Sequence, residues 1–196
     1  EITLPAPLRK HGPVATSFEL QAALPVEKGG INLRLGDDMH MRGRMRADGA
    51  MNGLIQFGEP LPAQAAYPAQ GLAVRGSVGE LDAAGWIAFA AAGEGTGALR
   101  TVDVQAASLV FLDHPFANSR VQLERTATAT QMRVAAATIE GTVDIPSDLA
   151  RGVQGRFSRL YFGAAGVPTT AAPVQADTDP AKVPPLRFTI DDLRMG

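Results

Sequence analysis

The chain has 196 residues, 45% of them hydrophobic, a formal net charge of −2 and no cysteine. This length fits about one domain or one and a half, and the hydrophobic fraction excludes a chain that is disordered throughout. The balanced charge argues against a nucleic-acid partner, and the lack of cysteine excludes disulfides and thiol-based sites. The longest strictly apolar stretch, around Trp86 to Ala92, is far shorter than the ~20 residues that span a bilayer.

Apolar and polar residues alternate in the first third of the chain. The run from Met39 to Arg46 places methionines on one face and His40 and arginines on the other. After turn residues 47–49, the run from Met51 to Phe57 resumes this pattern, which predicts a hairpin with one dry face. Weaker alternation predicts further strands over Val14 to Ala22, Ile31 to Leu35 and Leu72 to Val78.

The segment from Asp82 to Ala92 interrupts this rhythm. Trp86, Phe89 and Ala90 have helical spacing behind Asp82, a suitable N-cap, so we expect one short amphipathic helix. The glycine-rich residues 93–97 follow this helix instead of opening one, so we interpret them as a linker and not as a phosphate-binding loop.

Alternation returns in the second half of the chain. The predicted strands are Val102–Ala106, Arg120–Glu124, Met132–Ala136, Ile139–Pro146, Val153–Phe157 and Leu186–Ile190. Around ten or eleven short strands predict an all-β, mostly antiparallel architecture with one apolar face. Two arrangements remain open: a curved sheet that forms an incompletely closed groove, and a closed β-sandwich.

Residues 163–184 are rich in Ala, Pro and Thr and have no periodicity, so we expect a flexible linker or loop there. The expected organisation is therefore a β-segment over residues 1–162, this linker, and the first strand of a further unit over residues 185–196. Because the chain starts with Glu1 and strand-like sequence runs up to Gly196, we expect an internal section of a longer protein, with any anchor outside it.

No group of residues predicts a catalytic or metal site. Asp37, Asp38 and His40, or Asp113 with His114, offer two or three ligands within one strand or turn, without a second cluster. No serine has the Gly-x-Ser-x-Gly context of a nucleophile elbow. We therefore expect a protein that is not an enzyme and has no catalytic residues, metal or cofactor.

The arginines opposite the methionine face are a further candidate site. Arg34, Arg42, Arg44 and Arg46 form a basic ladder that could bind phosphate. Aromatic residues for base stacking are missing beside them, so we interpret the ladder as a solvated outer face.

The apolar face itself is the remaining candidate site. Moving a C16 tail into water costs on the order of 12 kcal/mol, which only a continuous apolar surface would offset. Methionine suits such a surface because its thioether adapts to varied apolar partners. The expected groove face is formed by Met39, Met41, Met45, Met51, Ile55, Phe57, Val102, Val104, Val121, Leu123, Met132, Val134, Ile139, Val143, Ile145 and Phe157.

Several segments resemble the YhdP-type AsmA-like family, which is related to TamB. Gly79 to Phe89 is similar to the family's short Leu-Asp-x-x-x-Trp helix, and Phe116 to Pro146 resembles its recurring strand pair ending in Gly-x-(Val/Leu)-x-Ile-Pro. Arg156 to Phe162, a Pro/Ala-rich linker and Pro185 to Gly196 then resemble the passage from one repeat to the next.

The resemblance implies a function in lipid transport. The chain would be a section of a periplasmic bridge, anchored in the inner membrane outside this segment, whose groove shields phospholipid acyl chains on the way to the outer membrane. A structural or protein-interaction module of the cell envelope, without catalysis, is the alternative. Because unpaired sheet edges recruit other strands, we also expect edge-to-edge self-association.

Overall fold

The computed structural model describes residues 17–25, 29–62, 65–66, 68–82, 99–111, 114–162 and 185–195. These residues form one sheet of twelve strands and a single 3₁₀ turn, η2 (Leu149–Arg151). The strands are β1 (Phe18–Ala22), β2 (Ile31–Leu35), β3 (Met39–Met45), β4 (Met51–Phe57), β5 (Leu72–Asp82), β6 (Leu99–Phe111), β7 (His114–Arg125), β8 (Ala129–Ala135), β9 (Ile139–Pro146), β10 (Val153–Phe162), β11 (Leu186–Ile190) and β12 (Leu193–Met195).

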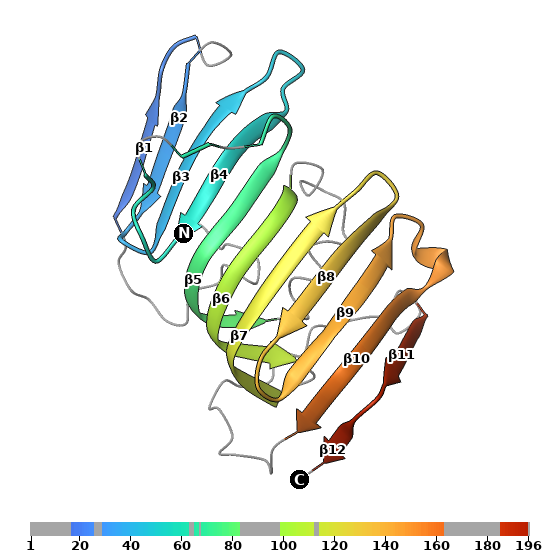
Figure 1. Ribbon diagram of the computed structural model, residues 1–196. Helices are drawn as coiled ribbons and strands as arrows, with labels where there is room; N and C mark the ends of the chain where they lie inside the picture. Colours follow the sequence, from blue (N-terminus) through green and yellow to red (C-terminus); the bar gives the residue numbers. More distant parts are fainter. Residues whose placement is uncertain are drawn as a thin grey trace, which may run out of the picture.

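The order of the strands in the sheet follows their order in the chain, from β1 to β11 (Figure 1). Neighbours are antiparallel from β1 to β4 and from β6 to β10, and parallel at β4–β5, β5–β6 and β10–β11. The short β12 also pairs with β10 in parallel and continues the line of β11. The prediction of an all-β, mostly antiparallel sheet is therefore confirmed.

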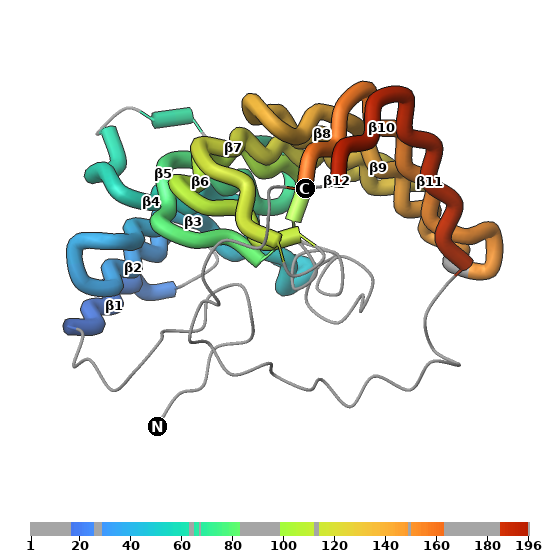
Figure 2. The backbone as a smooth tube through the Cα atoms, turned by 90° about the horizontal axis from the view of Figure 1, so that it is seen from below, coloured from blue at the N-terminus to red at the C-terminus, as the bar shows by residue number. Residues whose placement is uncertain are grey.

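Viewed from below, the sheet is bent into an arch with β1 and β11 at opposite sides (Figure 2). These two edge strands do not pair with each other, so the sheet stays open, as expected for the incompletely closed form. The alternative of a closed β-sandwich is wrong, because the strands belong to one sheet and not to two facing ones.

The predicted strands lie where the alternation placed them, and several are longer than expected. The hairpin of β3 and β4 closes through a turn in which Gly49 has φ of 80°, a conformation that favours glycine. His114, considered above as a ligand beside Asp113, lies in a strand and not in a turn, because His114 and Pro115 begin β7. Apart from Asp82, which ends β5, the predicted helix lies outside the described residues, as do residues 93–97, Asp113 and the expected linker at 163–184.

β11 and β12 are held to β10 by contacts at the two residues between them. The Asp191 amide donates to the Phe157 carbonyl at 2.9 Å, and the Leu160 amide donates to the Asp192 carbonyl at 2.9 Å. The Tyr161 hydroxyl donates to the Asp192 carboxylate, which lowers the pKa of Asp192 and raises the pKa of Tyr161. Asp191 and Asp192, the two residues between β11 and β12, are therefore both hydrogen-bonded to β10.

Glycine allows large rings to cover neighbouring strands in the last third of the sheet. A Cβ at Gly141 would lie 2.4 Å from Cδ1 of Phe157 and 2.6 Å from the Arg156 carbonyl oxygen. A Cβ at Gly155 would lie 2.4 Å from Cδ1 of Phe188. The Phe157 and Phe188 rings therefore occupy space that a side chain on the adjacent strand would need.

Replacing Gly141 by Ala should accordingly destabilise the fold by about 1–3 kcal/mol, because the new methyl group overpacks the site beneath Phe157. Urea denaturation followed by circular dichroism measures this change. Gly79→Ala is the matched control, since a Cβ there meets nothing within 4 Å. Equal midpoints for the two variants would contradict the packing described here.

Candidate functional site

Two rows of apolar residues cross the sheet at right angles to its strands. Their members are directly opposed in the register of each neighbouring pair, so each row takes one residue from every strand from β1 to β11. The first apolar row is Leu20, Leu33, Met41, Ile55, Val74, Val102, Leu123, Met132, Val143, Gly155 and Phe188. The second apolar row is Phe18, Leu35, Met39, Phe57, Gly76, Val104, Val121, Val134, Gly141, Phe157 and Ile190.

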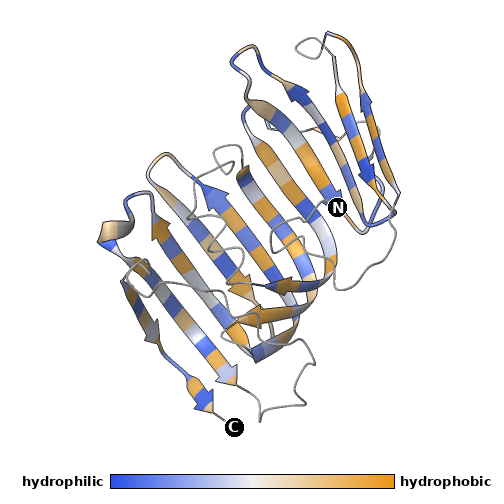
Figure 3. Ribbon diagram, turned by 180° about the vertical axis from the view of Figure 1, so that it is seen from behind, coloured by the Kyte–Doolittle hydropathy of each residue, from blue (hydrophilic) through white to orange (hydrophobic). Residues whose placement is uncertain are grey.

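All the residues expected on the groove face lie on this one face, which we call the inner face. Twelve of them belong to the two rows. Met45 and Met51 oppose each other beyond the rows, while Ile139 opposes Leu160 and Ile145 opposes Thr130. The alternation of hydrophobic and hydrophilic residues along each strand is visible in Figure 3. No polar residue interrupts either row between its ends.

Burial along the rows changes from the edges to the middle. In the first row, Leu20 on β1 is 54% exposed, Val102 on β6 is 3% exposed and Phe188 on β11 is 38% exposed. The predicted face residues of β3 and β4 are half-buried, whereas those of β6 to β10 are all buried. The inner face is thus a packed core towards β10 and partly accessible towards β1.

Aromatic contacts show how strongly the sheet is bent at the packed end. Four strand spacings separate β6 from β10, which is about 19 Å in a flat sheet. The ring centroids of Phe111 on β6 and Phe157 on β10 are nevertheless only 5.9 Å apart. His114 and Phe116 on β7 likewise approach Phe162 on β10, with centroid distances of 4.8 and 6.1 Å.

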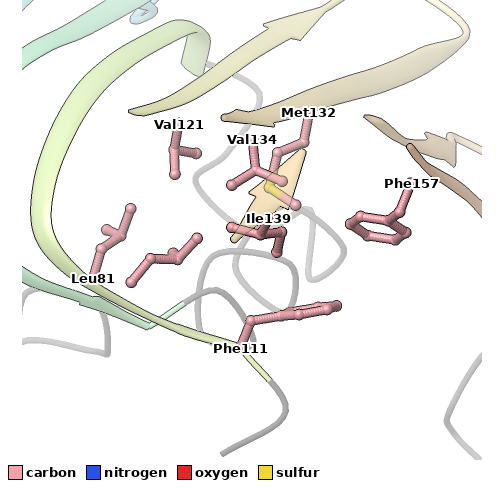
Figure 4. A pocket seen from close by; sticks show the side chains of 8 residues that line it. Leu81, Phe111, Val121, Met132, Val134, Ile139 and Phe157 are labelled. Carbon is pink, nitrogen blue, oxygen red and sulfur yellow. The ribbon is translucent and has the colours of Figure 1, made fainter. Parts of the chain in front are cut away.

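The packed end contains a cavity of only about 10 Å³, which is barely enough for one water molecule (Figure 4). Its lining is entirely apolar. The lining residues are Leu81, Leu109, Phe111, Val121, Met132, Val134, Ile139 and Phe157. A cavity of this volume is too small for an acyl chain.

Sequence reasoning missed three of these lining residues, Leu81, Leu109 and Phe111. Leu81 and Leu109 each come directly after two successive residues that are not buried, so the strict period of two is broken just before them, and Phe111 continues the shifted alternation two residues after Leu109. The sequence signal that could have identified these residues is that the alternation resumes one residue late in both β5 and β6.

The outer face of β3 and β4 is less solvated than the arginine ladder suggested. Leu54, which opposes Arg42, is 1% exposed, and Gln56 is also buried. The connection from β4 to β5 crosses this face, where Arg42 donates to the Pro62 carbonyl at 3.3 Å. The Asn52 side chain donates to the Ala69 carbonyl and accepts from the Gly71 amide. The parallel pairing of β4 and β5 requires such a crossing, and alternation alone does not locate it.

The outer face of the central strands carries paired charges. Arg120 donates through Nε and Nη2 to the Asp103 carboxylate at 2.8 and 2.6 Å, which lowers the pKa of Asp103. The pair therefore stabilises the fold above the ordinary pKa of Asp, and this contribution is lost as the pH falls through the lowered value. Both side chains are about half exposed, so the contribution is small.

The residues considered as metal ligands are not gathered into a site within the described ranges. Asp37 pairs with Arg34, and Arg46 of the same basic ladder pairs with Asp48 at 2.9 Å. No group of three metal-ligating side chains occurs among the residues that the structure describes. In the same part of the chain, no helix combines the length and the apolar character that crossing a membrane demands.

Comparison with known proteins gives one finding. A family model described as YhdP protein matches residues 1–196, which is the whole chain. No curated protein and no solved structure matches.

Proposed function

The chain belongs to the YhdP family of envelope-associated lipid-transport proteins, a family not known as enzymatic, and from this premise we propose a role for the inner face. The chain is a section of a periplasmic bridge, anchored outside this segment. Its inner face shields phospholipid acyl chains as they pass between the inner and outer membranes. The observation that carries this proposal is the pair of apolar rows that run without interruption from β1 to β11.

The rows supply what a moving hydrocarbon tail requires. Each methylene that enters water costs about 0.8 kcal/mol, so a gap or a charge along the path would act as a barrier. Both rows run perpendicular to the strands, and each step from strand to strand meets another apolar residue. A tail that follows the rows therefore exchanges one apolar surface for the next.

The half-buried part of the inner face is the best candidate for first contact with lipid. Met39, Met41 and Met45 on β3 face Phe57, Ile55 and Met51 on β4, and each of these side chains is half-buried. Flexible thioethers adapt to tails of different length and unsaturation. In the packed part between β6 and β10, the lining side chains leave a cavity of only about 10 Å³ between them.

That nearly filled interior favours a second candidate, a structural module without lipid cargo. In this case the buried residues of β6 to β10 form an ordinary core, and the unpaired edges of β1 and β11 serve association. Edge-to-edge self-association stays a prediction, supported by exposed apolar residues on both edge strands: Phe18, Leu20, Leu186 and Phe188.

Photo-crosslinking separates the two candidates. A benzophenone-bearing residue replaces Met41 on the inner face of β3 or, as the matched control, the exposed Arg44 on the outer face of the same strand. After irradiation in the bacterial envelope, we expect phospholipid adducts from position 41 and at least about tenfold fewer from position 44. Equal adducts at both positions, or none at position 41, would favour the structural module.

A further inference from the structure

Three adjacent strands bend at the same level. The ladder between β5 and β6 skips the pair Gly79 and Ala107, and the ladder between β6 and β7 skips Ala107 and Asn118, although the register is the same on both sides. Asn118 has φ of 50° and is the one non-glycine residue with positive φ among those described. We call Gly79, Ala107 and Asn118 the bend row.

The burial pattern loses its period of two at the bend row, although the register between the strands is kept. In β5, Gly79 and Glu80 are both exposed, and the next residue, Leu81, is buried. In β7, Ala117 and Asn118 are both exposed and Ser119 is fully buried, with its hydroxyl donating to the Phe116 carbonyl at 3.0 Å. Beyond the bend row the inward-facing positions fall one residue later in each strand, and Figure 1 shows the ends of β5 and β6 curving over.

The folded-over ends cover the packed part of the inner face. We call them the flap, which comprises residues 80–82, 108–111 and 114–117. Figure 1 shows the lower ends of β5 and β6 curving beneath the neighbouring strands, and Figure 4 shows Leu81 and Phe111 opposite Val134 and Ile139. The flap supplies Leu81, Leu109 and Phe111 to the cavity lining, and β7 to β10 supply the rest.

The contact between the flap and the sheet across the cavity is made by apolar side chains. Every side chain that lines the cavity is apolar, so separating the two walls breaks no hydrogen bond made by these side chains. A tail that entered between them would replace apolar contacts with apolar contacts. Because the present cavity holds about 10 Å³, a tail can enter only if the walls separate.

We propose that the flap is a gate, which swings about the bend row to admit an acyl chain to the inner face between β6 and β10. This inference rests on the proposed function and deepens it. The half-buried part on β3 and β4 then receives the tail, and the flap controls its passage into the packed part. With the gate closed, the flap side chains shield the empty inner face from water.

A removable tether between flap and sheet tests the gate. His114→Cys combined with Phe162→Cys places one thiol on the flap and one on β10, at side chains that are only half-buried and whose rings are 4.8 Å apart. The chain has no other cysteine, so a bifunctional methanethiosulfonate joins these two positions alone, and a reductant releases them. The probe is a phospholipid carrying a diazirine in its acyl chain, and adducts are mapped by mass spectrometry.

The untethered protein should give adducts both at Met41 or Ile55 and beneath the flap at Met132 or Ile139. Tethering should reduce the adducts beneath the flap at least about tenfold, leave those on β3 and β4 unchanged, and be reversed by reductant. The single variant Phe162→Cys, treated with the same reagent, controls for the substitution itself.

The remaining outcomes are distinguishable. Adducts on β3 and β4 with none beneath the open flap, or adducts beneath a tethered flap, overturn the gate and leave the proposed function standing. No adducts anywhere on the inner face overturn both. Circular dichroism of the tethered and untethered forms verifies that each is folded before irradiation.

Discussion

Replacing Val134 by Asp is expected to unfold the chain, at a cost of about 4 kcal/mol or more. Val134 is 4% exposed, lies in the second apolar row between Val121 and Gly141, and lines the nearly filled cavity. A carboxylate there has no cationic or hydrogen-bonding partner among the lining residues, so its desolvation is uncompensated. Urea denaturation followed by circular dichroism measures the loss.

Arg133→Asp is the matched control for this substitution. Arg133 is the preceding residue of β8 and is exposed on the outer face, so the same aspartate stays in water and should change stability by no more than about 1 kcal/mol. If both variants unfold at the same urea concentration, the interior between β6 and β10 is not the core described here. A transport defect in Val134→Asp would also report lost folding, and not a lost contact with lipid.

Replacing Ile55 by Asp should have the opposite profile, with the fold retained and lipid binding lost. Ile55 is half-buried on β4 and lies in the first apolar row between Met41 and Val74, where a carboxylate keeps partial access to water. The charge interrupts the row at the part that we expect to meet lipid first. Native mass spectrometry across a series of phosphatidylethanolamine vesicle concentrations should find the apparent Kd for lipid raised at least about tenfold, which corresponds to about 1.4 kcal/mol.

Arg44→Asp introduces the same residue on the outer face of β3 and should leave lipid binding unchanged. The comparison carries weight only if both variants unfold within about 1 kcal/mol of the unmodified chain, which urea denaturation establishes. Undiminished binding in Ile55→Asp would show that the row is not the path of the tail.

The strand pattern could be predicted because half-buried strands have a period of two that their own residues display. Met39 to Arg46 and Ile139 to Pro146 alternate without help from distant parts of the chain; β9 has the predicted bounds, and β3 ends at Met45, one residue before the predicted end. The inner face followed for the same reason, since each predicted side chain shares a face with its neighbours two residues away.

The bend row was not predicted, because the late return of alternation within one strand does not show that the same break in two other strands lies beside it. Gly79, Ala107 and Asn118 are far apart in sequence, and only the register of β5, β6 and β7 brings them into line. The burial of Leu54 on the nominally polar face was missed for a related reason, since the connection that crosses there has no periodicity of its own. The parallel pairings of β5 and β10 depend likewise on long connections.

The central claim is that the inner face holds phospholipid, and native mass spectrometry of the unmodified chain tests it most directly. After incubation with phosphatidylethanolamine vesicles and removal of free lipid, we expect a population of chains whose mass is increased by whole phospholipid molecules. A chain that stays lipid-free at every vesicle concentration, while remaining folded by circular dichroism, would contradict it.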